Sequence, residues 1–113
     1  MSEWGVANGV NHLVYVSLLA DVDVPLVDDL AADLERIAVS MDEFRFLDTV
    51  GYRLAVLGQE GYGAGGDSDR HLASVRRGLR LIARAMTLEP GFEIERHYEF
   101  AKNVEECLLA NSG

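Results

Sequence analysis

The chain has 113 residues, of which 49% are hydrophobic and 26% are charged, and its formal net charge is −9. This composition is typical of one folded domain with a single core and excludes a disordered chain. Because a strongly negative protein is repelled by phosphate backbones, nucleic acid is an unlikely partner.

The first ten residues show no hydrophobic periodicity, so we interpret residues 1–10 as a flexible N-terminal arm whose Trp4 could dock on a neighbouring surface. Residues 11–113 are then a single α+β domain. Residues 11–20 are rich in β-branched side chains and apolar on both alternating faces, which predicts a central strand covered on both sides.

A helix is predicted next. Asp23 offers an N-cap oxygen, and Pro25 fits a first helical turn because its missing N–H costs nothing there. Apolar residues then recur at spacings of three and four, which places them in one stripe. They are Val27, Leu30, Leu34, Ile37 and Met41.

The middle of the chain predicts a hairpin followed by a loop. Residues 44–57 hold two short β-rich runs, with Asp48 and Gly51 between them as turn formers. Residues 58–67 contain five glycines, and so permissive a backbone favours a flexible loop.

The last third of the chain predicts a second helix and a final strand. The helix begins near Ser68, keeps strict spacings of three and four from Leu72 to Met86, and stops at Pro90. Residues 92–100 alternate apolar and polar, as in a strand with one wet face, and a short helix follows. One longer helix over residues 93–110 is the alternative.

The resulting order β-α-β-β-α-β predicts a ferredoxin-like sandwich, in which two helices cover one face of a four-stranded antiparallel sheet. Such a sheet has a second face, and the apolar residues 11–20 imply that this face also needs cover. A second subunit could provide it.

A glycine fingerprint in the predicted loop is a candidate anion site. Gly61, Gly63 and Gly66 match the spacing GxGxxG, and Arg70 follows. Two features weaken this interpretation: Asp67 and Asp69 stand where phosphate would bind, and a lone glycine fingerprint has many false matches. A plain loop is therefore favoured.

Two groups of carboxylates are weak candidates for a metal site. Asp21 and Asp23 end the predicted first strand and could hold Mg²⁺ for phosphoryl transfer, but helix capping explains Asp23 without a metal. On a final strand, one face would carry several possible ligands, although an exposed strand face looks the same. They are Glu93, Glu95, His97 and Glu99.

The second helix carries a stripe of arginines opposite its apolar face. The arginine stripe consists of Arg70, Arg76, Arg77, Arg80 and Arg84. It could dock carboxylates or phosphates, form an interface with another protein together with Trp4, or be neutralised by acids of the same domain.

These patterns favour a non-catalytic acidic protein that works through protein–protein contacts, as a homo-oligomeric assembly component or as a binder of a basic protein. A small anion- or nucleotide-binding regulatory domain is the alternative, and a Mg-dependent enzyme is third. No cofactor is expected. The single cysteine, Cys107, and the lack of a secretion signal or a bilayer-length apolar run predict a cytoplasmic protein without a membrane segment.

Overall fold

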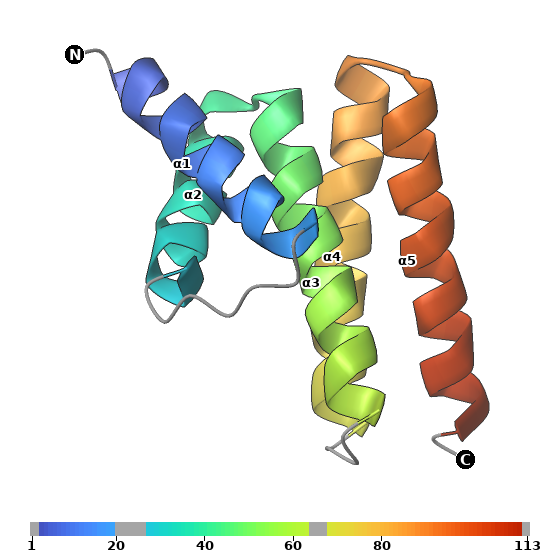
Figure 1. The fold of residues 1–113 in the computed structure, drawn as a ribbon. Helices are drawn as coiled ribbons and strands as arrows, with labels where there is room; N and C mark the ends of the chain where they lie inside the picture. Colours follow the sequence, from blue (N-terminus) through green and yellow to red (C-terminus); the bar gives the residue numbers. More distant parts are fainter. Residues whose placement is uncertain (1–2, 20–26, 64–67, 112–113) are drawn as a thin grey trace.

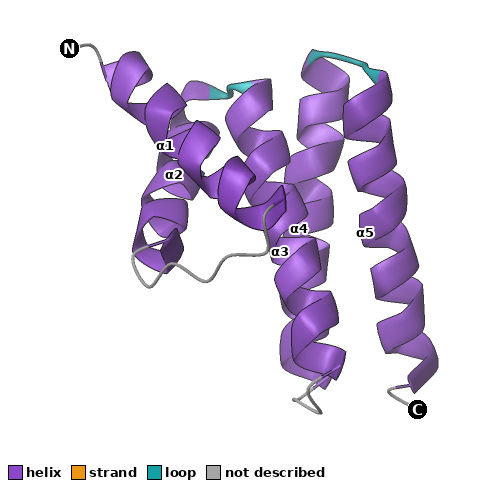
Figure 2. Ribbon diagram, in the orientation of Figure 1, coloured by secondary structure: helices purple, strands orange, loops and turns teal. Residues whose placement is uncertain are grey.

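The computed structural model describes residues 3–19, 27–63 and 68–111, and these form a bundle of helices (Figures 1 and 2). In chain order the helices are α1 (Glu3–Leu19), α2 (Val27–Met41), α3 (Phe44–Gly63), α4 (Ser68–Leu88) and α5 (Phe92–Asn111). No strand occurs in the described residues, so the predicted ferredoxin-like α+β sandwich is wrong.

Each predicted strand lies in a helix. Residues 11–19 of the supposed strand over residues 11–20 fall in α1, Ala20 lies outside the described residues, and α1 already begins at Glu3, within the supposed arm. The supposed hairpin over residues 44–57 is α3, which continues to Gly63 into the supposed loop. Residues 92–100 begin α5, which agrees with the alternative of one long helix. The two amphipathic helices are confirmed as α2 and α4.

The helix α3 occupies the centre of the bundle. It runs antiparallel to α4 along most of its length, α5 folds back beside both, and α1 crosses obliquely over α2 and α3 (Figure 1). The fully buried side chains come from every helix, and the largest include Val14, Leu34, Phe46, Ile82 and Leu108. Among the described helices, none combines the length and the apolarity needed to cross a bilayer.

Two glycines let α3 and α4 approach closely. A Cβ atom at Gly51 would lie 2.6 Å from Cγ1 of Ile82 and 2.7 Å from the backbone oxygen of Gly78. A Cβ atom at Gly78 would in turn lie 2.6 Å from the Gly51 oxygen. Each glycine therefore faces the backbone of the other helix, and neither position has room for a side chain. Gly51 is a helix-contact residue and not the turn former that the sequence suggested.

A left-handed residue makes the turn between α2 and α3. Asp42 has a φ of 54°, and the N–H of Glu43 donates to the oxygen of Ala38 at 3.3 Å, which is the long bond of a Schellman motif. The Asp42 carboxylate accepts from Arg84 of α4, with Arg84 Nε 2.8 Å from Oδ1. This guanidinium lowers the pKa of Asp42. The turn is thus fixed both to its own helix and to α4.

We expect Gly51→Ala to lower the free energy of unfolding by about 2 kcal/mol, because the added methyl group overpacks a backbone contact that cannot relax cheaply. Gly9→Ala is the control, since a Cβ at Gly9 meets nothing within 4 Å; its helix propensity should raise stability by up to about 1 kcal/mol. Urea unfolding followed by circular dichroism measures both. Equal stability of the two variants would contradict the close approach.

Candidate functional site

The outward side of α1 is apolar and exposed. Its side chains Val6, Leu13 and Val16 are 51%, 45% and 43% exposed, and Gly9 lies between them with open space around it. At 100° per residue these four positions fall within an arc of about 80°, on the side of the helix opposite the buried Ala7 and Val14. We call these four residues the α1 outer face.

The helix α1 is also nearly free of charge. Among its 17 residues Glu3 is the only acid, and it contains no lysine or arginine. A largely apolar helix is normally buried on most of its sides, whereas in the described structure α1 packs on α2 and α3 and reaches α5 through Tyr15, which contacts Glu93 and His97. The α1 outer face is therefore an exposed apolar surface that none of the described helices covers.

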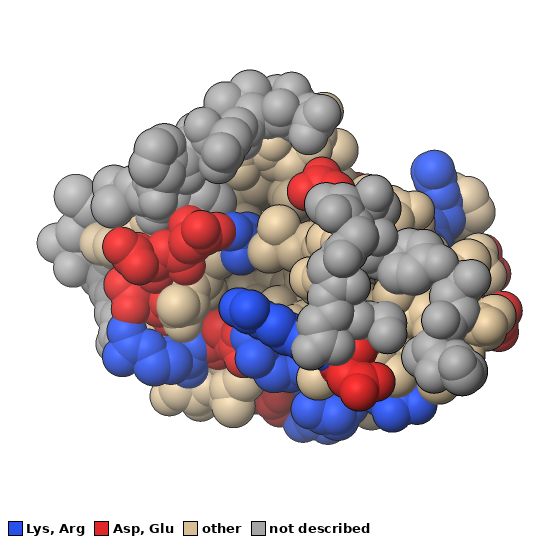
Figure 3. Space-filling view, turned by 90° about the horizontal axis from the view of Figure 1, so that it is seen from below, with Lys and Arg blue, Asp and Glu red and all other residues tan. Residues whose placement is uncertain are grey.

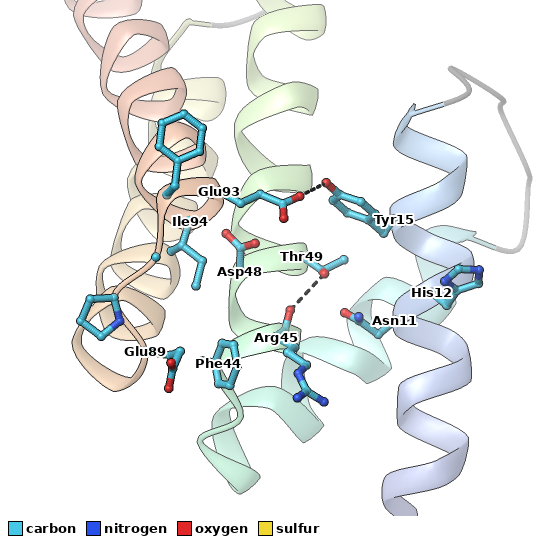
Figure 4. Close-up of a pocket in the computed structure, with 13 residues that line it drawn as sticks. Asn11, His12, Tyr15, Phe44, Arg45, Asp48, Thr49, Glu89, Glu93 and Ile94 are labelled. Carbon is cyan, nitrogen blue, oxygen red and sulfur yellow. Dashed lines mark hydrogen bonds between the residues drawn. The ribbon is translucent and has the colours of Figure 1, made fainter.

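A cavity of about 420 Å³ lies on the other side of α1, between this helix, the first half of α3 and the turn from α4 to α5 (Figure 4). Tyr15 reaches across it and donates a 2.6 Å hydrogen bond to Oε1 of Glu93. Burial of the phenol and the hydrogen bond to Glu93 raise the pKa of Tyr15 to about 12. The bond ties α1 to the start of α5.

A buried polar pair lies beside this cavity. Nδ1 of His97 in α5 is 2.9 and 3.0 Å from the two carboxylate oxygens of Asp48 in α3. Tyr52 stacks on the imidazole with 4.1 Å between ring centroids. In the described part of the chain no hydrogen bond joins His97 to a nucleophile, so we interpret the pair as a link between α3 and α5 and not as a catalytic dyad.

The sequence analysis did not connect Asp48 with His97. A signal was present in α5, because His97 interrupts an apolar repeat at spacings of three and four, and a polar residue in a core position needs a buried partner. The repeat consists of Ile94, Ala101, Val104 and Leu108, all buried. The identity of the partner, 49 residues away in the chain, required the structure.

The arginine stripe lies on the exposed side of α4, and acids of the same domain neutralise part of it. Arg77 pairs with Glu35 at 3.0 Å and Arg76 with Glu105 at 3.2 Å, and Arg84 pairs with Asp42. Basic and acidic side chains accordingly lie beside one another in the view from below (Figure 3). Arg70 and Arg80 are exposed and form no ion pair with any described residue.

The other predicted site residues are not brought together. Gly61 and Gly63 are in the last turn of α3, where the backbone N–H groups that an anion would need donate within the helix, and a Cβ at Gly61 would overlap the His71 ring. Gly66, Asp21 and Asp23 lie outside the described residues, as does the side chain of Trp4 at the start of α1.

The possible ligand stripe of the final strand is on α5 instead, where helical spacing disperses its members, Glu93, Glu95, His97 and Glu99. In the described part of the chain, no three histidine, cysteine or acidic side chains are grouped so as to hold a metal ion.

Comparison of the chain with protein-family models, with curated proteins and with solved structures finds no significant match.

Asp48→Ala should lower the free energy of unfolding by about 2–3 kcal/mol, because it leaves the His97 nitrogen buried without a partner. Asp28→Ala removes a carboxylate that pairs with Arg53 but is 82% exposed, and it should cost less than about 1 kcal/mol. Urea unfolding at neutral pH compares the two. Similar losses in both variants would show that the Asp48–His97 pair contributes no more than an exposed one.

The raised pKa of Tyr15 predicts a loss of stability at alkaline pH. The folded protein keeps the phenolic proton up to about pH 12, whereas the unfolded chain releases it near pH 10, so the contribution of Tyr15 is complete below pH 10 and is lost as pH rises to 12. Tyr15→Phe should show a shallower decline of stability between these values. Urea unfolding curves at pH 8, 10 and 11.5 measure the stability of both proteins. If the wild type and Tyr15→Phe lose stability equally over this range, the raised pKa of Tyr15 is contradicted.

Proposed function

We propose that this protein works by protein–protein contact and that it self-associates through the α1 outer face. The observation that carries this proposal is the exposure of three large apolar side chains in a row on a nearly uncharged helix. They are Val6, Leu13 and Val16, about half exposed. Monomeric proteins seldom leave such contiguous apolar surface in water.

The spacing of the α1 outer face suits a second helix. Positions 6, 9, 13 and 16 are separated by three, four and three residues. This spacing is typical of the contact line along which two helices pack with knobs-into-holes geometry. Gly9 leaves open space at the middle of the seam, so a partner helix can come close there. In a two-fold dimer this surface would face itself.

The charge of the chain favours a second copy as the occupant. Each copy carries −9, so most orientations of two copies bring carboxylates together. Two copies that meet through the α1 outer face avoid this repulsion between carboxylates, because α1 contains a single acid. A basic partner protein would instead be attracted to the acidic surfaces of the other helices.

The interface should be small. A helix of 17 residues is about 26 Å long, and its outer face alone offers less than the ~800 Å² per partner of a standard interface. We therefore expect a dimer whose population rises with protein concentration.

Light scattering coupled to size-exclusion chromatography, over a range of concentrations, tests this proposal. The mass should rise from 12.4 kDa toward twice that value, and Leu13→Glu with Val16→Glu should keep it at 12.4 kDa. Val39→Glu with Met41→Glu, at exposed positions of α2, adds the same charge elsewhere and should dimerise like the wild type. A wild-type monomer at every concentration would refute self-association.

A further inference from the structure

A shallow hollow between α4 and α5 has an excess of positive charge in an otherwise acidic protein. Its volume is about 300 Å³. We call it the α4–α5 hollow, and its charged lining residues are Arg76, Arg80, Lys102 and Glu105. Leu79, Ala83 and Tyr98 complete the wall.

The cations of the hollow are only partly neutralised. Arg76 and Lys102 both contact Glu105, each at 3.2 Å, so one carboxylate serves two positive groups. Arg80 pairs with no described residue. The lining therefore carries three positive charges and one negative charge. Elsewhere in the arginine stripe Arg77 and Arg84 each have a carboxylate of their own.

The cations are also accessible. The side chains of Arg76 and Lys102 are 49% and 45% exposed, whereas that of Glu105 is 15% exposed beneath them. Three further acids of α5 are exposed near Lys102 along the helix, but they do not line the hollow. They are Glu95, Glu99 and Glu106.

We infer that the α4–α5 hollow binds a phosphate monoester through Arg76, Arg80 and Lys102. Two arginine forks can each donate a pair of parallel hydrogen bonds to phosphate oxygens, and an ammonium group adds a third positive contact. A net charge of +2 matches a monoester, which carries about −1.5 to −2 near pH 7, better than it matches a single carboxylate. This site is separate from the glycine fingerprint and does not depend on self-association.

Titration with inorganic phosphate, followed by NMR at constant ionic strength, tests the inference. Saturating shifts should appear in residues 76–83 and 98–105, with a dissociation constant on the order of millimolar. Arg80→Gln should weaken binding about fivefold or more, because it removes the cation of the hollow that no described carboxylate engages. The matched control is Arg70→Gln, which removes an exposed arginine of the same helix that pairs with no described residue, and it should change the dissociation constant less than about twofold.

A third variant should bind phosphate more tightly than the wild type. Glu105→Gln frees Arg76 and Lys102 from their shared carboxylate and should tighten phosphate binding about fivefold. Equal weakening by Arg70→Gln and Arg80→Gln, no gain from Glu105→Gln, or shifts confined to other helices would overturn the site.

The same titration with a neutral-sequence phosphoserine peptide and its unphosphorylated form distinguishes the sources of the monoester. Tighter binding of the phosphopeptide than of inorganic phosphate would identify a modified protein as the ligand. Equal affinities would identify a small phosphorylated molecule, and binding of both peptides alike would overturn phosphate recognition.

Discussion

The backbone contact of α3 and α4 at Gly51 and Gly78 is the constraint on which the rest of the bundle depends. It brings two long helices together over most of their length and so makes α3 the central element. With α3 in this position, Asp48 can reach His97 of α5 on one side, while α1 and α2 pack on others. The buried Asp48–His97 pair follows from this arrangement.

The sequence correctly predicted the helices that have one buried face and one exposed face. α2 and α4 each bury one stripe and expose the other, so the apolar period is clear. In α1 apolar residues lie on several sides of the helix axis, and in α3 every residue from Phe46 to Gly51 is buried. Neither segment shows one apolar face and one polar face, so the helical periodicity is weak in the sequence. Glycines that indicate turns in most sequences serve here as points of helix contact.

A candidate site could be predicted from the sequence only where all of its residues lie on one helix. The arginine stripe follows from spacing along α4, but its partners Glu35, Asp42 and Glu105 are brought to it by folding. The apolar character of residues 11–20 suggested an uncovered sheet face, whereas the structure has no sheet in its described residues and the exposed apolar side chains lie on one side of α1. Only the structure shows that Glu105 is shared by two cations.

The dense contact between α3 and α4 also bears on the order of folding. These helices are neighbours in the chain, as are α4 and α5, and closing short connections costs little chain entropy. We expect this part of the bundle to form first, and α1, which has fewer contacts, to dock last and open most readily. A partner bound to α1 would then stabilise the element that needs stabilisation most.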